Sequence, residues 1–319
     1  MAKRKPTTAT VSASASKTMA TGYVFEDAFL GYELEPGHPE SPQRLIAIRD
    51  KFSDSGIDKR LVRIEPIADT LPHIAAIHTK SHIASIQKLD PVGKIAQLAA
   101  GGAIAAVKAV CEGAVRNAFC ALRPPGHHAR NTGREEGFCF YNNVAIAARY
   151  AQKVFKCKKI LIVDWDFHHG NGTEESFYED PTVLYFSTHY PLAYPGTGHP
   201  DKEGKGDGLG YNINVSLSCG ATDDDIVEVF QSTFLPRANQ FRPDFVLVSA
   251  GFDSRTNDKL GCMDITDAGF GRLTQIVMAT AHSHCNDRLV SVLEGGYTPP
   301  DLAEAVFTHV KTLLEYMPG

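Results

Sequence analysis

The chain has 319 residues, of which 43% are hydrophobic and 22% charged, enough apolar residues for the core of one large α/β domain or two smaller ones. Its net charge of -5 argues against an electrostatic grip on nucleic acid, and peptides or small cationic molecules suit it better as partners. No stretch reaches about 18 consecutive apolar residues, so we expect no segment to span a membrane.

Residues 1–20 differ from the rest of the chain in composition. They are rich in Ser, Thr and Ala, carry Lys3, Arg4, Lys5 and Lys17, and contain no acidic residue. This composition predicts a disordered tail, with a transit peptide of the same bias as the alternative. Because no internal repeat and no Gly/Ser linker follows, residues 21–319 are expected to form a single domain.

From residue 22 onward, short apolar runs alternate with segments of helical periodicity. This alternation favours parallel strands joined by crossover helices. The predicted strands are 23–26, 61–64, 118–122, 160–163, 183–187, 212–217, 245–250 and 289–293. The predicted helices are 41–52, 95–115, 142–154, 223–238, 267–281 and 302–316.

Polar residues follow several of these strands directly. After strand 160–163, the segment DWDFHHGNG places Asp164, Asp166 and His168 on one side of an extended chain, where two carboxylates and an imidazole converge as in a metal site. The alternative is that these residues only cap the next helix. Asp253 follows strand 245–250, and on its own it could also be a helix cap.

Two further strand ends carry candidate catalytic side chains. After strand 118–122, the rigid turn RPPGHHAR holds His127 and His128, which suit proton transfer although a surface pair is the alternative. After strand 289–293, EGGY carries Tyr297, which either packs in the core or donates to a developing oxyanion. A divalent metal held by Asp166, His168 and Asp253 would keep an open coordination position for water and substrate.

The seven cysteines are scattered without a close pair such as C-x-x-C. This pattern is typical of thiols in a reducing compartment rather than of a disulfide framework. We therefore expect a cytoplasmic location, with the nucleus left open. The residues expected to be core or neutral thiols are Cys111, Cys120, Cys157, Cys219 and Cys285.

Seven motifs in a fixed order identify a family resemblance. They are HPESPQRL, RPPGHH, GFCFYNN, DWDFHHGNG, PGTG, SAGFDS and LEGGY. With them the sequence resembles the zinc-dependent histone deacetylase superfamily, nearest to its class II and bacterial deacetylase-like members. The resemblance implies the arginase-deacetylase fold, a single α/β domain with a mainly parallel sheet of about eight strands flanked by helices.

The same resemblance implies roles for the strand-end residues. Zn²⁺, or alternatively Fe²⁺, would be held by Asp166, His168 and Asp253. The catalytic set would be His128, His127, Tyr297, Asp164 and Asn171. In this set His128 is the general base toward a metal-activated water and later protonates the leaving amine, and Asn171 orients it. His127 is paired with Asp164, while Tyr297 clamps the carbonyl oxygen.

The resemblance also implies a narrow substrate tunnel and sites for monovalent cations. Gly137, Phe138, Tyr194 and Leu260 would line the tunnel, with Tyr194 where the family usually has Phe. Arg44 matches an arginine that lines an inner cavity, and a surface salt bridge is the alternative. One K⁺ site would use Asp164, Asp166, His168, Ser187 and Thr188, and a second would use Phe177, Asp180, Val183 and Tyr211.

The implied activity is hydrolysis of N-acetyl-lysine, or another acyl-lysine, in a protein or peptide. One rival is an acetylpolyamine amidohydrolase, although Leu260 stands where some polyamine-specific members have glutamate. A binuclear manganese ureohydrolase would need a second set of bridging carboxylates, which the sequence does not offer. A binding module or scaffold without catalysis is disfavoured by Tyr297. The oligomeric state is left open.

Overall fold

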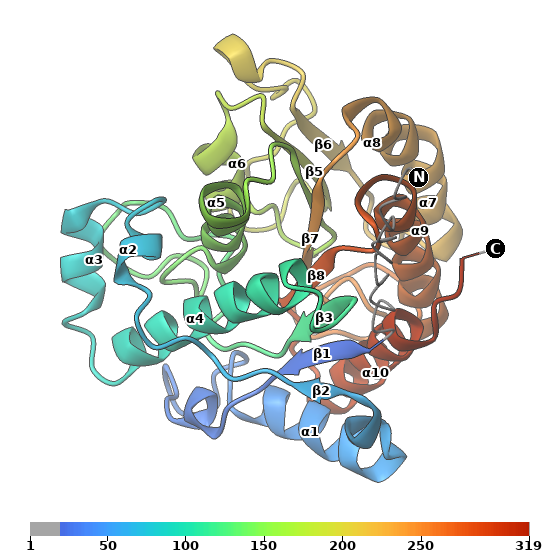
Figure 1. The fold of residues 1–319 in the computed structure, drawn as a ribbon. Coiled ribbons are helices and arrows are strands. Elements are labelled where there is room, and N and C mark those ends of the chain that lie inside the picture. The colour runs from blue at the N-terminus through green and yellow to red at the C-terminus, as the bar shows by residue number, and fades with distance from the viewer. Residues whose placement is uncertain (1–19, 319) are drawn as a thin grey trace, which may run out of the picture.

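Eight parallel strands form one sheet in the order β2-β1-β3-β8-β7-β4-β5-β6 in the computed structural model, which describes residues 20–318 (Figure 1). The predicted tail therefore lies outside the described residues, apart from Ala20. The predicted parallel sheet of eight strands flanked by helices is confirmed. The strands are β1 Thr21–Val24, β2 Val62–Arg63, β3 Asn117–Cys120, β4 Ile160–Asp164, β5 Val183–His189, β6 Asn212–Ser216, β7 Phe245–Ala250 and β8 Leu289–Leu293.

The strand bounds agree best with the prediction at the centre of the sheet. Strands β7 and β8 have the predicted bounds, because continuous apolar runs mark strands that are buried on both faces. Next to the edge strand β2, β1 begins and ends two residues earlier than predicted. Its pairing with β3 runs from Thr21 opposite Asn117 to Val24 opposite Cys120, and this register decides where both strands end.

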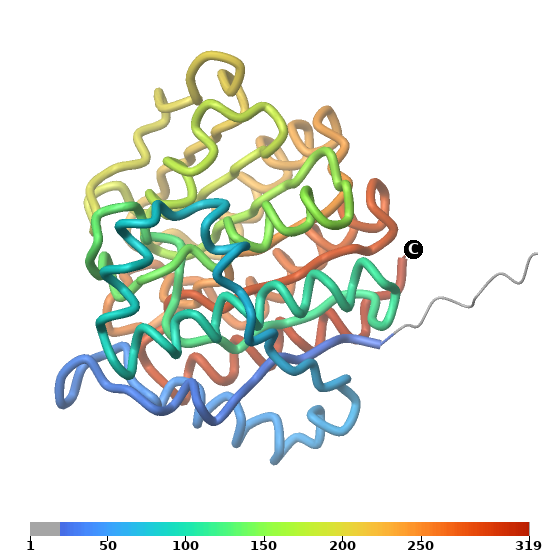
Figure 2. The backbone as a smooth tube through the Cα atoms, turned by 60° about the vertical axis from the view of Figure 1, so that its left-hand side comes forward, coloured from blue at the N-terminus to red at the C-terminus, as the bar shows by residue number. Residues whose placement is uncertain are grey.

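Helices cover both faces of the sheet. The helices α4 and α5 pack on one face, whereas α9, α10 and, through α10, α1 cover the other (Figure 1). The α-helices are α1 Gln43–Ser55, α2 Leu71–Ile74, α3 Lys80–Ile86, α4 Val92–Cys111, α5 Asn143–Phe155, α6 Asn171–Phe177, α7 Asp223–Val229, α8 Leu235–Phe241, α9 Asp267–Cys285 and α10 Pro299–Glu315. The blue and yellow segments lie at opposite ends of the molecule, as Figure 2 shows from a second direction.

One predicted helix, 223–238, is divided in the structure. A π-helical segment, η4 Phe230–Phe234, separates α7 from α8. Pro236 lies two residues after this segment, and its missing N–H removes one bond of the α-helical ladder, which explains why the ladder changes there. The short helices α2 and α3 and the 3₁₀ turns η1 Asp27–Leu30, η2 Ile57–Arg60 and η3 Gly206–Gly208 were not predicted.

Helix α4 is long and apolar enough, by length and composition alone, to cross a membrane. In the structure, however, 67% of its apolar window is buried. It lies close to the sheet, because a Cβ on Gly102 would come within 2.8 Å of Leu122 and 2.9 Å of Val24. Packing against the sheet accounts for the apolar composition of this helix.

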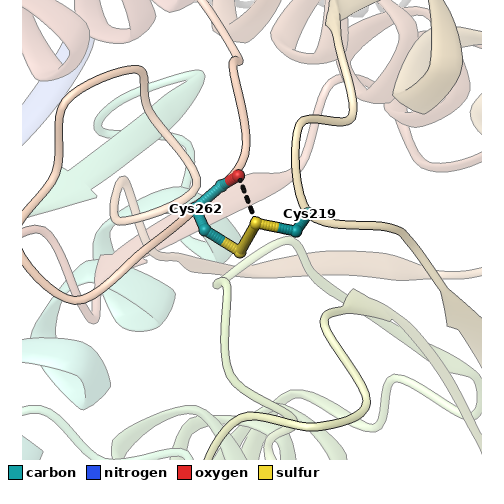
Figure 3. Close-up of a disulfide and its surroundings, with 2 residues drawn as sticks. All are labelled: Cys219 and Cys262. Carbon is teal, nitrogen blue, oxygen red and sulfur yellow. Dashed lines mark hydrogen bonds between the residues drawn. A yellow bond between two sulfur atoms is a disulfide. The ribbon is translucent and has the colours of Figure 1, made fainter.

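A disulfide joins the loops that follow β6 and β7. Cys219 and Cys262, with Cα atoms 5.1 Å apart, are bonded although 43 residues separate them in sequence (Figure 3). The expectation that Cys219 is a core or neutral thiol is therefore wrong, because two loops bring it to a partner that spacing alone does not reveal. The other five cysteines are free, as expected. The cytoplasmic location stays a prediction.

Three buried charges hold the N-terminal segment against the sheet. Glu40 lies between Arg123, whose Nε donates at 2.5 Å, and Arg44, whose Nη1 donates at 3.2 Å. All three side chains are completely buried. The Tyr32 hydroxyl also donates to Glu40 at 2.8 Å. Both guanidinium groups share this one carboxylate, and Arg44 also donates to the Gly296 carbonyl at 2.6 Å, so the buried ions are paired and hydrogen-bonded, which is the condition under which they are tolerated.

Replacing Glu40 with Ala should reduce the free energy of unfolding by about 3–5 kcal/mol, because two guanidinium groups would remain buried without their carboxylate. Urea denaturation followed by fluorescence of the single tryptophan, Trp165, measures this loss. Glu304→Gln is the control, since it removes a partly exposed partner of Lys51 and should cost less than about 1 kcal/mol. Equal losses in the two variants would contradict the account of the buried cluster.

Candidate active site

The carboxyl ends of four neighbouring central strands meet at one edge of the sheet. In the order β3-β8-β7-β4, the register places Asp164 opposite Ser249, and Ser249 opposite Val292. The residues that leave these strands therefore converge, as ligand-binding residues do in open parallel sheets. The side chains delivered there are His127 and His128 after β3, Asp164, Asp166 and His168 at the end of β4, Asp253 after β7, and Tyr297 after β8.

Asp166, His168 and Asp253 form a compact group of potential metal ligands. Nδ1 of His168 lies 2.9 Å from Oδ2 of Asp253 and 3.1 Å from Oδ1 of Asp166. One ligand atom from each of the three side chains lies within 4.8 Å of the others. Both carboxylates are buried. Within residues 20–318, this is the one group of three or more such side chains with the geometry of a metal site.

Backbone amides fix the orientation of both carboxylates. The N–H of Gly295 donates to Asp166 Oδ2 at 2.7 Å, and the N–H of Phe167 donates to Asp253 Oδ1 at 2.8 Å. A Cβ at position 295 would collide with the Asp253 carboxylate, so only glycine allows β8 to approach this closely. The remaining carboxylate oxygens face His168, as supported metal ligands do.

The proton affinities of this group fit a cation site. Burial and the charge of Asp166 raise the pKa of Asp253 to about 7. Burial acts against a charged imidazole at His168, but hydrogen bonds to the two carboxylates outweigh it and raise its pKa to about 10. Two carboxylates thus compete for one positive charge. A divalent cation held by the three side chains would satisfy both, and the O, N, O donor set suits zinc.

His128 is held as a neutral imidazole with one free nitrogen. Its Nδ1 lies 2.9 Å from Oδ1 of Asn171, and because an amide oxygen only accepts, Nδ1 must carry the proton. Nε2 is therefore left as an acceptor. Burial, followed by the charges of His127 and His168, lowers the pKa of His128 well below its ordinary value. A neutral imidazole with an available nitrogen is what a general base requires.

His127 has the opposite environment. Its Nδ1 lies 3.1 Å from Oδ2 of Asp164, to which the Tyr185 hydroxyl also donates at 2.9 Å. Burial opposes protonation, but the charges of Asp166, Asp164 and Glu294 raise the pKa of His127 to about 10. Neighbouring histidines thus differ in charge, because one faces carboxylates and the other an amide.

Glu294, which no sequence motif singled out as functional, organises the histidine turn. Its Oε2 accepts from the N–H of Gly126 at 2.7 Å and from the N–H of His127 at 3.1 Å. The Ser249 hydroxyl donates to its other oxygen at 3.2 Å. Burial raises the pKa of this carboxyl to about 7. A charged residue directly after a buried strand was the available signal for its role.

Tyr297 is a buried hydroxyl donor at the bottom of a pocket. Its side chain is 5% exposed, and burial, followed by the charge of Asp253, raises its pKa well above the ordinary value, so that it stays protonated. Arg44 lies 5.0 Å from the ring centre, and its Nε donates to the Gly296 carbonyl at 2.6 Å. Arg44 is completely buried, so the alternative of a surface salt bridge is wrong.

Asp258, on the loop after β7, also supports Tyr297 and was missed in the sequence. Its Oδ2 accepts from the N–H of Tyr297 at 2.6 Å and from the N–H of Thr298 at 3.2 Å, while Oδ1 accepts from Leu260 at 2.9 Å. One carboxylate therefore ties the loop after β7 to the turn after β8. Nothing in its spacing from Asp253 indicated this contact.

A pocket of about 470 Å³ leads from the surface to these side chains. Phe138 and Tyr194 form part of its walls, and the Tyr194 ring lies 4.9 Å from that of His128. A Cβ at Gly137 would collide with His128, so glycine lets this wall lie close to the base. Leu260 also lines the pocket and is 38% exposed. The structure therefore brings the four predicted tunnel residues together.

The residues predicted to bind monovalent cations lie in two places. Asp164 is paired with Ser187 across β4 and β5, and the buried Thr188 hydroxyl has no hydrogen-bond partner among residues 20–318. In the second place, backbone hydrogen bonds connect Phe177, Asp180 and Val183, and another connects Tyr211 to Tyr185. The Asp180 carboxylate already pairs with Arg149 at 2.6 Å.

A parallel α/β sheet that carries a group of potential metal ligands beside a neutral histidine is typical of metal-dependent hydrolases. The histone deacetylase domain model matches residues 38–313. The chain belongs to the histone deacetylase family, whose members hydrolyse amide bonds and are generally zinc-dependent. The family resemblance inferred from the motifs is thus confirmed.

Similar proteins cover nearly the whole chain. A probable deacetylase of Archaeoglobus fulgidus is 38% identical over 88% of this chain and 82% of its own length. Histone deacetylase 15 of Arabidopsis thaliana is 38% identical over 94% of this chain, which spans 58% of that longer protein. The crystal structure of the HDA15 HD domain matches with a TM-score of 0.87 at 37% identity, covering 93% of this chain and 91% of that domain.

Replacing Asp258 with Ala should lower kcat by about 100-fold, because Tyr297 would lose the acceptor that fixes its backbone. Zinc content should not change, since the three ligands keep their own contacts. Asp258→Asn keeps an acceptor oxygen and should restore most of the rate. Deacetylase kinetics together with elemental analysis of each variant give the result, and a wild-type kcat in the Ala variant would contradict the positioning role.

Proposed function

We propose that this protein hydrolyses the amide bond of N-acetyl-lysine, or of another acyl-lysine, and releases the free acid and the lysine amine. The observation that carries the proposal is the pocket of about 470 Å³ whose lining includes His128, His168 and Tyr297. Its largely aromatic and aliphatic walls suit the methylene stem of a lysine side chain. The amide at the end of that stem would reach the base and the hydroxyl together.

Asp166, His168 and Asp253 would hold a divalent cation, for which zinc is the first candidate and Fe²⁺ the alternative. When bound, the cation supplies a Lewis acid that polarises the acyl carbonyl and lowers the pKa of water. We also propose K⁺ at the two places described above. The Thr188 hydroxyl, which has no hydrogen-bond partner among residues 20–318, supports the first of these, and the backbone hydrogen bonds that bring Phe177, Asp180 and Val183 together support the second.

His128 would move the proton during the reaction. Its unprotonated Nε2 accepts a proton from the attacking water, while Asn171 holds the ring through Nδ1. The same nitrogen then returns that proton to the amine nitrogen as the C–N bond breaks. His127, positively charged beside Asp164, favours a neutral His128 before the reaction begins.

Tyr297 would stabilise the charge that develops on the acyl oxygen. Its buried hydroxyl is protonated and lines the pocket, so it can donate a hydrogen bond where the negative charge appears. The turn that carries it is held by a hydrogen bond from Arg44 to the Gly296 carbonyl and by one from the Tyr297 N–H to Asp258. The donor is therefore in place before the substrate binds.

His128→Ala should reduce turnover by about 100- to 10,000-fold, the usual contribution of a general base. Tyr297→Phe should reduce it by about 100- to 1,000-fold, because one oxyanion donor is lost while the ring remains. Metal content should stay at the wild-type value in both variants, since neither residue is a proposed ligand. Steady-state rates measured beside the zinc content of each variant give the result, and near-normal rates would contradict these roles.

An acetylpolyamine amidohydrolase is the alternative function, because the chemistry would be the same and only the tunnel would differ. The deciding experiment measures acetate release by zinc-loaded protein from an acetyl-lysine peptide and from acetylated spermidine, each with a chelated control. We expect turnover of the peptide that is lost with the chelator. Turnover of the polyamine alone would overturn the proposal, and so would binding of the peptide without release of acetate.

A further inference from the structure

The mouth of the pocket carries one acidic side chain that the proposed reaction does not use. Glu135 lines the pocket together with Phe138, Tyr194 and Leu260, and its side chain is half-buried. The rest of the lining is largely aromatic or aliphatic, apart from the two histidines at its base. A carboxylate among apolar side chains is less screened than one on an open surface.

The position of this carboxylate is fixed by the backbone of the tunnel wall. Gly137 and Phe138 both have left-handed φ angles, +54° and +68°, and this conformation turns the Phe138 N–H toward Glu135. Oε1 of Glu135 accepts that hydrogen bond. The neighbouring residue Glu136 pairs by backbone hydrogen bonds with Cys139, which closes the same turn. One oxygen of Glu135 is therefore engaged and the other is available to a ligand.

Among residues 20–318, no cation neutralises Glu135. Arg130, on the same loop, is engaged elsewhere: its Nε donates to Glu136 at 3.1 Å, and its Nη1 lies 3.7 Å from Glu175. Across residues 20–318, no lysine, arginine or histidine lies within ion-pair distance of Glu135. A fixed negative charge thus faces the place where a substrate enters, beside a tunnel suited to an uncharged acyl-lysine side chain.

We propose that Glu135 determines substrate preference by binding a positively charged side chain adjacent to the acyl-lysine in a peptide. The inference rests on the proposed function, since it assumes that the acyl-lysine occupies the tunnel. Neighbouring Cα atoms of a peptide are about 3.8 Å apart, so a residue next to the acyl-lysine crosses the mouth where Glu135 lies. Because only one oxygen is available, lysine and arginine should be accepted alike.

The test compares kcat/KM for three acetyl-lysine peptides that differ only in the residue next to the acetyl-lysine, which is Arg, Gln or Glu. For the wild-type protein we expect the order Arg, Gln, Glu, with Arg about fivefold above Gln, as for a partly exposed ion pair. Glu135→Gln should abolish this preference. Glutamine still accepts from the Phe138 N–H, so the tunnel wall keeps this contact. The Arg-to-Gln and Glu-to-Gln ratios of kcat/KM, taken within each variant, separate the preference from any change in the overall rate.

Glu228→Gln is the matched control, since it removes an exposed carboxylate of α7 that does not line the pocket and should keep the wild-type preference. A preference that survives in Glu135→Gln would overturn the proposal. An equal loss on all three peptides would also overturn it, because it would show that Glu135 only supports Phe138. If Glu135→Gln lowered kcat/KM for acetylspermidine and for none of the peptides, the cation bound by Glu135 would belong to a polyamine. That result would overturn the proposal that it belongs to a peptide. Failure of the wild-type protein to hydrolyse any peptide would instead contradict the proposed function itself.

Discussion

Two carboxylates lie against one imidazole in the buried interior of this protein, and the rest of the active site depends on that constraint. Asp166 and Asp253 are withdrawn from water at the carboxyl ends of β4 and β7. Like charges in a dry interior repel each other strongly, so the pair needs a cation between them. Without a metal, His168 retains a proton and so offsets part of this repulsion. A divalent cation would offset all of it.

The same electrostatic logic separates the roles of the two adjacent histidines. His127 faces Asp164 and holds a proton, whereas His128 faces the amide of Asn171 and does not. The Asn171 amide stabilises a protonated imidazole less than a carboxylate in its place would. His128 is therefore a weaker base, but it stays neutral. The buried carboxyl of Glu294 fixes the turn that carries both residues, so their orientation is set by β8 rather than by the turn alone.

Much of this could be predicted from the sequence, because continuous apolar runs mark buried strands and the polar residues directly after them belong to the site. The proposed metal ligands, both histidines and Tyr297 were all predicted in this way, and the structure brings them together. Three features could not be predicted, because they depend on contacts between distant loops. Asp258 supports Tyr297 from another loop, Cys219 is bonded to Cys262, and the buried Glu40 pairs with Arg123, 83 residues further along the chain. Local sequence carries no signal for such contacts.

The most direct test of the central claim is diffraction at the zinc absorption edge from crystals of the zinc-loaded protein. The account predicts one anomalous peak per chain, at a bonding distance of about 2.0–2.2 Å from His168 Nδ1 and from carboxylate oxygens of Asp166 and Asp253. Two peaks that share a carboxylate would indicate a binuclear hydrolase. That result, or a single peak away from these three side chains, would contradict the account.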